Sequence, residues 1–570
     1  MNLDAVAHEA QAKTPQGLLL TPATDDPTWW RRAAIYQIYV RSFADGNGDG
    51  TGDIAGLRSR LPYLADLGVD AMWITPWYAS PLADGGYDVS DYRQIHPDFG
   101  TLAEAEALIA EALELGIRTI IDIVPNHLSD HHPWFRDALA APAGSPERER
   151  FWFVDSKEMP TAWVSPFAGT TWTRTTNPDG TPGQWYLHLF TPQQPDVNWN
   201  HPDVRAEYED ILRFWFDRGV GGVRIDSAAL LFKDAALPEV PAEPGPGEHP
   251  FQDRDELHEL YASWRAIADS YPGARALVGE IWLPDVDRFV RYVQPGELHT
   301  AFNFDFLARQ WDPAQLRESI DVTLAAHAPV SAPSTWVLSN HDVTRPVTRY
   351  GREDSSFAFA TKAYGVPTDL TLGLNRARAA ALLTAALPGA LYIYQGDELG
   401  LPEVEDLPRD VLTDPMHFRS GGTDPGRDGC RVPLPWTRTG TSLGFGPDGS
   451  AAPWLPQPRD WSELSVEAQA ANPRSTLSLY RDALALRRSD EDLRGEDFAW
   501  LDATQLATVV NTAHVDATQI LAFRRGAHTV CITNFSRKPV ALLHGAAVLL
   551  ASDELVADEL APDTTAWLRV

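Results

Sequence analysis

Short apolar runs alternate with longer amphipathic stretches over most of the chain. Eight runs have the length and near-continuous apolar character of strands buried on both faces of a parallel sheet: Ile35–Val40, Ala71–Thr75, Thr119–Val124, Gly222–Ile225, Ala276–Gly279, Ala301–Phe304, Thr335–Leu338 and Ala390–Tyr394. Helical patterns lie between them, over Leu102–Leu115, Tyr208–Arg218 and Arg376–Leu387, and each ends at a glycine or proline. Eight strands separated by helices predict a (β/α)8 TIM barrel, in preference to an open doubly wound sheet.

Two segments interrupt this alternation of strand and helix patterns. Residues 127–200 are rich in Trp, Pro, Thr and Gly and have little periodicity. They are too many for a plain loop in a compact domain, so they predict a small inserted domain after the third strand. The segment Leu237–Gln252 is dense in Pro and Glu and predicts a mobile or irregular rim. The barrel is therefore expected over residues 29–126 and 201–488, with residues 1–28 as a loosely held arm.

The pattern changes after a helical stretch at Thr476–Arg488. Apolar or alternating runs follow, with Gly and Asn between them: Phe498–Val510, Gln519–Arg524, Thr529–Asn534, Val540–Leu543 and Ala547–Leu550. Such short runs separated by turn residues are typical of antiparallel sheets. Residues 489–570 are therefore predicted to form a C-terminal antiparallel β-sandwich.

Composition narrows the class of protein. The chain has 79 acidic and 47 basic residues, a formal net charge of −32, which disfavours nucleic acid and anionic membranes as partners. Its two cysteines, Cys430 and Cys531, provide neither a disulfide framework nor a zinc site. The N-terminus lacks the pattern of a secretory signal, and no apolar run is long enough to span a bilayer. We expect a cytoplasmic protein, monomeric or a small homo-oligomer, whose partner is a small molecule.

Three carboxylates follow apolar runs directly: Asp226, Glu280 and Asp342. A single Asp in such a place is usually a helix N-cap or a turn residue. The three together lie at the ends of strands four, five and seven, where barrel enzymes build their active sites. Paired carboxylates at one end of a barrel are typical of enzymes that hydrolyse glycosidic bonds, in which one acts as nucleophile and the other as acid/base. Arg224 lies two residues before Asp226, on the same strand face, where it can be a plain ion pair or can keep Asp226 ionised.

Four segments in this order carry a family resemblance: Asp-Ile-Val-Pro-Asn-His (122–127), Gly-Val-Arg-Ile-Asp (222–226), Val-Gly-Glu (278–280) and Ser-Asn-His-Asp (339–342). With them, the chain resembles the α-amylase family of glycoside hydrolases (family 13) over about residues 29–570. Gln-Pro-Asp-Val-Asn (194–198) and Gly-Arg-Asp-Gly-Cys-Arg-Val-Pro-Leu-Pro-Trp (426–436) look like the oligosaccharide-cleaving α-glucosidase branch of that family.

The resemblance assigns roles to the carboxylates. Asp226 matches the nucleophile that forms a covalent glycosyl-enzyme. Glu280 matches the general acid/base, so its pKa should lie above that of Asp226. Asp342 matches the third carboxylate, which holds sugar hydroxyls.

Other residues match sugar-binding positions of the family: Tyr87, Asp88, His127, Arg224, His341 and Arg431. Tyr87 would stack on the terminal sugar, Asp88 would bind its outer hydroxyls, and Arg431 would reach the same sugar. The two histidines would bind hydroxyls near the cleaved bond, although a single histidine is more often part of the core. The Gly-Gly-Tyr-Asp segment could also be a plain turn, with the aspartate as its cap.

A loop after the first strand places oxygen-bearing side chains at alternate positions with glycines between them: Asp45, Asn47, Asp49, Thr51 and Asp53. This spacing is similar to the first part of an EF-hand loop without its distal Glu. It also resembles the calcium loop of the α-glucosidase branch, with the Thr51 carbonyl as one ligand. A structural Ca²⁺ is expected here; the alternative is an Asp/Gly-rich turn without metal. No organic cofactor is expected.

We expect a retaining, exo-acting α-glucosidase that acts on short oligosaccharides. Ser227 follows the nucleophile where α-1,6-cleaving members commonly have Val, which favours α-1,4 bonds. One alternative keeps the intermediate and transfers it to a sugar, as in a 4-α-glucanotransferase or a sucrose- or trehalose-handling enzyme. A more remote alternative is a non-catalytic homologue of the family.

Overall fold

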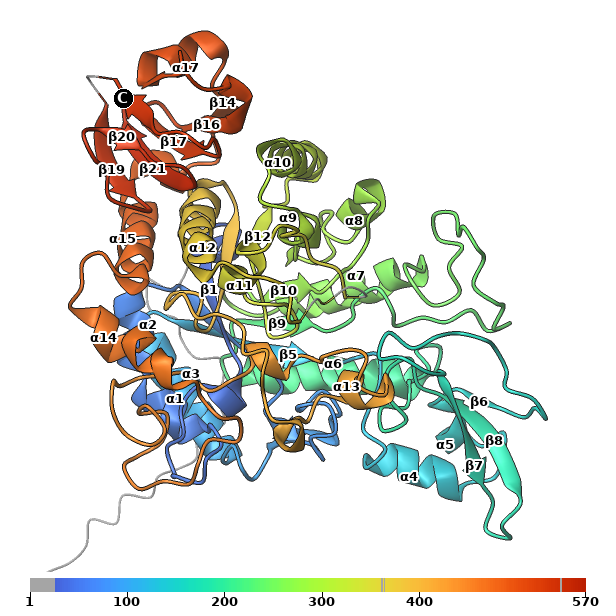
Figure 1. Cartoon of the computed structure of the whole chain (residues 1–570). Coiled ribbons are helices and arrows are strands. Elements are labelled where there is room, and N and C mark those ends of the chain that lie inside the picture. The colour runs from blue at the N-terminus through green and yellow to red at the C-terminus, as the bar shows by residue number, and fades with distance from the viewer. Residues whose placement is uncertain (1–25, 360–361, 363, 544–545) are drawn as a thin grey trace, which may run out of the picture.

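A computed structural model describes residues 26–359, 362, 364–543 and 546–570. All but residues 26–28 of the predicted arm lie outside the described residues. Eight parallel strands form one nearly closed barrel sheet, in the order β11-β10-β9-β5-β2-β1-β13-β12 (Figure 1). They are β1 (Ala34–Ile38), β2 (Ala71–Ile74), β5 (Arg118–Ile123), β9 (Gly222–Ile225), β10 (Ala276–Gly279), β11 (Thr300–Ala301), β12 (Thr335–Val337) and β13 (Ala390–Tyr394). Each overlaps one of the eight predicted runs, so the predicted barrel is confirmed; the overlap of β11 is only Ala301, because the predicted run 301–304 continues into a loop and the start of α9.

Helices cover the outside of the barrel. The main ones are α1 (Ile54–Ser59), α2 (Leu61–Leu67), α3 (Leu102–Glu114), α6 (Pro202–Asp217), α7 (Glu256–Asp269), α8 (Val286–Arg291), α9 (Phe304–Ala308), α10 (Pro313–His327), α11 (Pro346–Tyr350), α12 (Leu370–Ala386) and α15 (Thr476–Ser489). Helix α3 begins with a capping box between Thr101 and Glu104, which pairs two backbone amides at its start. Helices α6 and α12 begin six residues earlier than predicted, after the caps His201 and Asp369.

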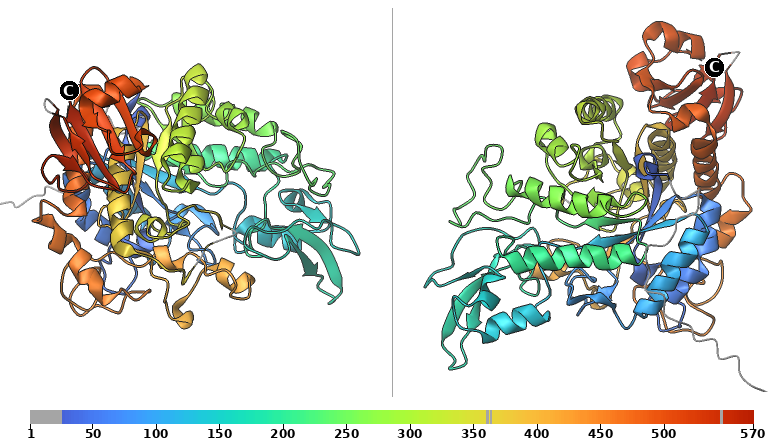
Figure 2. Two further views of the ribbon diagram at one scale, coloured as in Figure 1. Left: turned by 45° about the horizontal axis from the view of Figure 1, so that its top comes forward. Right: turned by 180° about the vertical axis from the view of Figure 1, so that it is seen from behind.

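The segment 127–200 holds a three-stranded sheet and two helices. The sheet has the order β6-β8-β7, with β6 at Phe153–Val154, β7 at Trp172–Thr176 and β8 at Pro182–Leu187. Helices α4 (Pro133–Ala140) and α5 (Pro146–Glu149) precede it. This segment and the C-terminal sheets lie on opposite sides of the molecule (Figures 1 and 2). Residues 237–252 contain no helix or strand, as the sequence predicts.

The C-terminal part contains two antiparallel sheets. One has the order β14-β16-β17-β21-β19 and the other β15-β18-β20. The strands are β14 (Phe498–Trp500), β15 (Val510–Asn511), β16 (Ile520–Arg525), β17 (Thr529–Asn534), β18 (Val540–Leu542), β19 (Ala547–Ala551), β20 (Glu559–Leu560) and β21 (Thr564–Arg569). One apolar cluster joins the two sheets, with Ile532 and Leu568 from the first and Val540 and Leu560 from the second. This is the predicted antiparallel sandwich.

One predicted strand of this region is wrong. Residues 498–510 form the short strand β14, the helix α17 (Ala503–Val509) and the start of β15. Asp502 starts the helix with a capping box to Gln505, which satisfies its first amides. The larger sheet rests on the barrel through α12: Thr565 Oγ1 donates to Ala379 O, and Trp567 Nε1 donates to Leu382 O. Short helices α13 (Pro415–Arg419), α14 (Val466–Ala470) and α16 (Glu491–Arg494) complete the fold.

No helix in the described part of the chain is both long and apolar enough to cross a membrane.

Candidate active site

A single buried guanidinium joins three carboxylates at the carboxyl ends of the strands. Asp122 on β5 and Arg224 on β9 are register partners, so their side chains leave the sheet on the same side. Arg224 Nη1 donates to Asp122 Oδ1 at 2.9 Å and to Asp226 Oδ1 at 2.8 Å. Its Nη2 lies 2.6 Å from Glu280 Oε2. The two carboxylates matched to nucleophile and acid/base therefore lie on the two terminal nitrogens of one cation.

Glu280 has two further donors. The backbone turns sharply after Asp226, because Ser227 adopts a left-handed conformation with φ of 48°. In this turn Ser227 N donates to Glu280 Oε2 at 3.0 Å. Trp282 Nε1 donates to the other oxygen, Oε1, at 3.1 Å. A strained residue between two reacting groups is a common feature of active sites, where it fixes geometry.

Burial raises the pKa of both reacting carboxyls. The pKa of Glu280 rises to about 7, and that of Asp226 to about 6, although the charge of Arg224 opposes both shifts. Each is also raised by a neighbouring carboxylate, Asp226 acting on Glu280 and Asp122 on Asp226. The order agrees with the roles assigned from the sequence, because the group of higher pKa is the one that must carry a proton.

Asp342 lies in a different electrostatic setting. Its Oδ1 accepts from Arg427 Nη1 at 3.0 Å and from Arg431 Nη2 at 2.9 Å, and its Oδ2 lies 3.4 Å from His341 Nε2. Burial alone would raise its pKa, but His341 and the two guanidiniums hold the pKa of Asp342 well below its usual range. Asp342 is therefore ionised at neutral pH.

The aromatic and imidazole groups matched to sugar binding also meet here. The Tyr87 ring stacks on His341 with centroids 5.3 Å apart and planes at 6°, and its hydroxyl donates to Asp122 Oδ2 at 2.9 Å. Gln37 Nε2 lies 2.7 Å from His341 Nδ1; as a donor it leaves the imidazole proton on Nε2, facing Asp342. His127 is buried, with Nε2 3.0 Å from Tyr87 O.

The three carboxylates matched to catalysis, together with Tyr87, His127 and His341, line one cavity of about 460 Å³, a size typical of small-molecule sites. The barrel, the segment 127–200, the segment 237–252 and the chain after β13 all contribute to its wall. The polar lining residues are Asp84, His127, Ser165, Asp226, Ser227, His249, Gln252, Glu280, His341, Asp342 and Arg427, and the aromatic ones are Tyr87, Phe167, Phe190, Phe251, Trp282 and Phe359. Among the described residues, this cavity gathers all three predicted catalytic carboxylates.

Arg224 holds the carboxylates but does not itself line the cavity, and two further predicted sugar-binding residues, Asp88 and Arg431, do not line it either. Asp88 is fully buried, and its carboxylate accepts from the amides of Ala83 and Asp84, so it shapes the turn. Arg431 lies behind the cavity wall, where it donates to Asp342 and to His341 O. The alternative that the sequence left open for Asp88, a turn-forming aspartate, is the one found.

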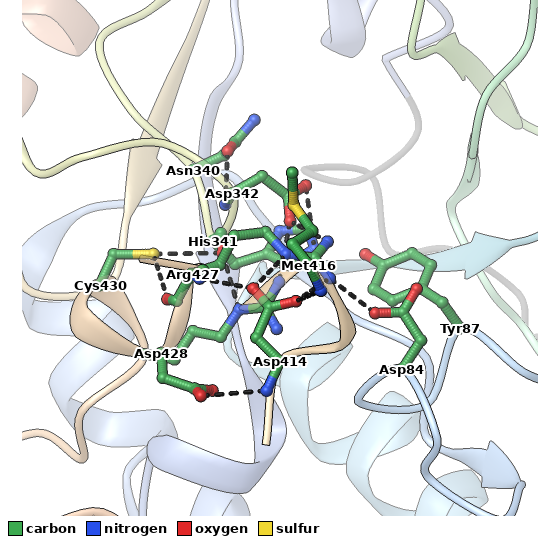
Figure 3. A network of polar contacts seen from close by, with 12 residues as sticks. Asp84, Tyr87, Asn340, His341, Asp342, Asp414, Met416, Arg427, Asp428 and Cys430 are labelled. Carbon is green, nitrogen blue, oxygen red and sulfur yellow. Dashed lines mark hydrogen bonds and ion pairs between the residues drawn. The ribbon is translucent and has the colours of Figure 1, made fainter. Parts of the chain in front are cut away.

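Asp84 and Arg427 occupy the cavity wall in their place. Arg427 Nη2 donates to Asp84 Oδ1 at 2.7 Å, its Nη1 to Asp342, and its Nε to Asp414 Oδ2 at 2.8 Å (Figure 3). The opposite oxygen of Asp84 accepts from Gln194 Nε2 at 3.1 Å. Arg427 lies within the segment 426–436 that the sequence singled out, and Asp84 directly precedes the Gly-Gly-Tyr-Asp segment. Each lies four residues before the residue that was predicted, so the sequence indicated the right loops but not the right positions in them.

A buried ion pair that sequence reasoning missed ties the segment 127–200 to the barrel. Lys233 Nζ lies 2.7 Å from Asp196 Oδ2, 2.6 Å from Asn126 Oδ1 and 2.8 Å from Leu230 O. Neither charged side chain is exposed. Asp196 Oδ1 also accepts from the amide of Leu189, a cavity-lining residue. The pair thus holds three stretches of the cavity wall together.

The loop predicted to bind calcium is tightly folded on itself. Asp45 accepts from the amides of Gly48 and Gly50, and Asp53 accepts from those of Gly46, Asn47 and Gly56. Its donor atoms are all oxygens, the kind that Ca²⁺ prefers. No three acidic, histidine or cysteine side chains of the described residues are grouped as in a metal site. A cation in this loop would therefore also need the Asn47 amide oxygen and backbone carbonyls such as that of Thr51.

Comparisons with known proteins agree with this geometry. The family model for the α-amylase catalytic domain matches residues 37–496. A protein of Rhizobium meliloti strain 1021 named probable α-glucosidase is 38% identical over 508 residues, covering 84% of this chain and 85% of the relative. The oligo-1,6-glucosidase of Parageobacillus thermoglucosidasius is 32% identical over 501 residues, covering 81% and 84%.

Two solved structures are similar over nearly their whole length. An α-glucosyl transfer enzyme superposes with a TM-score of 0.79 at 34% identity, covering 95% of this chain and 99% of that chain. A variant of the isomaltulose synthase of Erwinia rhapontici NX5, in complex with its natural substrate sucrose, superposes with a TM-score of 0.80 at 28% identity, covering 95% and 99%.

Proposed function

This chain belongs to the α-amylase family of glycoside hydrolases, and from that premise we propose that it is a retaining α-glucosidase that releases terminal α-1,4-linked glucose from short malto-oligosaccharides. One observation carries the proposal: Asp226 and Glu280 contact the two terminal nitrogens of Arg224 at one cavity. Two carboxyl groups bound to one guanidinium lie close together, as in retaining enzymes, where they are about 5–5.5 Å apart. Inverting enzymes need a larger separation, because a water molecule must fit between the base and the sugar.

The reaction proceeds in two displacements. In the first, an Asp226 oxygen attacks the anomeric carbon and forms an ester bond, while the glycosidic C–O bond breaks and Glu280 gives its proton to the leaving oxygen. In the second, Glu280 takes a proton from water, the water oxygen bonds to the anomeric carbon, and Asp226 leaves as a carboxylate. A Glu280 pKa of about 7 leaves the group protonated often enough for the first step and ionised often enough for the second.

Exo action is supported by the end of the cavity beyond Asp226. There Asp84 and Arg427 form an ion pair at 2.7 Å, and Tyr87 lies against His341. These groups offer hydroxyl partners and an apolar face to one terminal sugar, as a site for a chain end requires. Asp342, held ionised, would accept hydrogen bonds from hydroxyls of the same ring.

Transfer to a sugar acceptor is the second candidate, because similar solved structures include a glucosyl transfer enzyme and an isomaltulose synthase. Both candidates share the intermediate on Asp226 and differ only in what attacks it. The proposed preference for α-1,4 bonds rests on Ser227 alone. The names of the relatives do not decide it, because they include a probable α-glucosidase and an oligo-1,6-glucosidase.

Product analysis on maltose, isomaltose, sucrose, trehalose and maltotriose tests the proposal. We expect glucose from maltose and maltotriose, released first as the α-anomer in a time-resolved NMR spectrum. Glucose from isomaltose but not from maltose would refute the linkage, and β-glucose as the first product would refute the retaining mechanism. Products longer than the substrate would favour transfer.

We also propose a structural Ca²⁺ in the loop Asp45–Asp53, supported by its all-oxygen donor set. The ion would be held by Asp45, Asn47, Asp49, Asp53 and the Thr51 carbonyl, and would neutralise acidic side chains away from the reacting groups. A cytoplasmic location is part of the same proposal; it is supported by Cys430 and Cys531, which are both buried and unpaired.

A further inference from the structure

A cavity of about 500 Å³ lies at the N-terminal ends of the barrel strands, away from the active site. Its wall includes Ala34, the first residue of β1, Asp70, which directly precedes β2, and Arg118, the first residue of β5. The catalytic carboxylates lie beyond the carboxyl ends of the strands, and the two cavities share no lining residue among those described. The volume is in the range of small-molecule sites.

The wall of this N-terminal cavity is rich in arginine. Five arginines line it against two aspartates, although the chain as a whole has a formal net charge of −32. The arginines are Arg32, Arg118, Arg487, Arg488 and Arg494, and the aspartates are Asp26 and Asp70. A concave surface lined by one sign of charge concentrates ligands of the opposite sign. The charge of the wall therefore favours an anion.

Each of the two aspartates already pairs with one arginine. Asp70 Oδ1 accepts from Arg488 Nη2 at 3.0 Å. Asp26 Oδ2 accepts from Arg32 Nη2 at 2.7 Å. Both arginines of these pairs are exposed, so they lie where a ligand can reach them. Such exposed pairs stabilise the fold little, and their guanidiniums keep donors for a further anion.

Two other arginines of the wall have no carboxylate partner. Neither Arg487 nor Arg494 forms an ion pair within the described part of the chain, and Arg494 is exposed. Arg487 is buried, and its Nη1 donates to Ala385 O at 2.6 Å and to Leu387 O at 3.0 Å. These carbonyls end helix α12 and carry only about half a negative charge. Burial lowers the pKa of Arg487 to about 10, so an anion nearby would stabilise its charge.

The cavity also offers apolar contact to the neutral part of a ligand. Leu115 on its wall is 47% exposed, an unusual state for a large apolar side chain at a cavity. The guanidinium of Arg118 lies over the ring of Trp29, 4.7 Å from its centroid, which orients its donors. Planar guanidiniums match the oxygens of a phosphate group. A nucleic acid or an anionic membrane would extend beyond the cavity over an acidic surface, which would repel it.

We propose that this cavity binds a small organic phosphate. The phosphate group lies among the guanidiniums of Arg118, Arg488 and Arg494. The neutral part of the ligand lies against Leu115. This site goes beyond the proposed function and does not depend on it, because it shares no residue with the active-site cavity.

Calorimetric titration of the full-length protein with inorganic phosphate, glucose 6-phosphate and ATP tests this. We expect at least one of the two organic phosphates to bind more tightly than inorganic phosphate, and the stronger of them identifies a sugar phosphate or a nucleotide as the class. Arg494→Gln should weaken its binding about tenfold, the effect of one hydrogen bond to a charged group. Arg537→Gln, at an exposed arginine of the C-terminal part, should leave binding unchanged.

Leu115 provides a second, independent pair of variants. Leu115→Glu places a negative charge on the wall, whereas Leu115→Gln has nearly the same shape without the charge. We expect Leu115→Glu to bind the organic phosphate about tenfold more weakly than Leu115→Gln does. Thermal unfolding establishes that each variant is folded.

Three results would overturn the proposal. Saturable binding of none of the three probes would exclude the site. Inorganic phosphate bound as tightly as both organic phosphates would exclude an organic ligand. Affinities that do not respond to Arg494→Gln and Leu115→Glu would place the bound phosphate elsewhere on the protein. Failure of the proposed function appears separately, as absence of hydrolysis of p-nitrophenyl α-glucoside by the parent enzyme.

Discussion

Replacing Arg224 by lysine should shift the pH dependence of catalysis. The guanidinium holds Asp122, Asp226 and Glu280 with two nitrogens at 2.6–2.9 Å, and a single ammonium cannot reach all three. A hydrogen bond to a charged group contributes about 1.5–3 kcal/mol. One pKa unit corresponds to about 1.4 kcal/mol, so losing this contact should raise the pKa of Asp226 by about 1–2 units from its present value of about 6.

The acid limb of kcat/KM reports this shift, because the free enzyme needs Asp226 ionised. We expect the limb of Arg224→Lys to move from near pH 6 to about pH 7–8, and kcat/KM at pH 6 to fall by about tenfold or more. The assay is initial-rate hydrolysis of p-nitrophenyl α-glucoside from pH 4.5 to 9, with thermal unfolding to establish that each protein is folded.

Arg487→Lys provides the matched control. Arg487 is also buried, but it donates to the carbonyls of Ala385 and Leu387 and contacts no catalytic carboxylate. It should change stability and leave the acid limb in place. A folded Arg224→Lys enzyme with an unchanged limb would refute the claim that this guanidinium sets the ionisation of Asp226.

Three further outcomes are expected. Asp226→Asn should abolish hydrolysis, and it should raise the melting temperature at pH 7.5 but not at pH 4.5. The reason is that the pKa of Asp226 is higher in the folded protein, about 6, than in the unfolded chain. Ionisation of such a carboxyl destabilises the fold increasingly as the pH rises from about 4 to 6, here by up to about 3 kcal/mol. Lys233→Met should raise KM about tenfold and lower the free energy of unfolding by about 3–5 kcal/mol, because it leaves the Asp196 carboxylate buried and unpaired. Adding Asp196→Asn should recover part of that free energy. Dialysis against EDTA should lower the melting temperature, with Ca²⁺ but not Mg²⁺ restoring it; a protein indifferent to Ca²⁺ contradicts the metal assigned to Asp45–Asp53.

The barrel could be predicted because its strands are buried on both faces. Such strands appear as continuous apolar runs whatever their neighbours, and each of the eight runs overlaps a strand of the barrel, the run 301–304 by one residue. The C-terminal sheets were harder to predict from the sequence. Leu506 and Val509 look like part of an alternating strand, but Asp502 and Gln505 form a capping box that favours a helix, and both apolar residues pack on one side of it.

Within the site, the three carboxylates predicted at strand ends line the cavity, whereas two of the residues predicted on loops, Asp88 and Arg431, do not. Arg224 and Asp226 follow from the period of two in a strand, which puts them on one face. Asp84 and Asp88 are separated by a turn in which Gly85 and Gly86 have φ of 58° and 108°. These left-handed conformations reverse the chain, and nothing in the local composition indicates which aspartate then faces the cavity.

The site combines two buried arginines that each hold three carboxylates, with opposite effects. Around Arg224, a single cation faces Asp122, Asp226 and Glu280, and burial raises the pKa of each.

Around Arg427, the partners are Asp84, Asp342 and Asp414, and the second guanidinium of Arg431 also acts on two of them. There the cations outweigh burial, and the pKa values of Asp342 and Asp414 lie well below their usual range. The reacting carboxylates therefore exchange protons near neutral pH while Asp342 and Asp414 stay charged. It follows that the pH dependence of kcat/KM between pH 5 and 8 should arise from the Arg224 cluster alone.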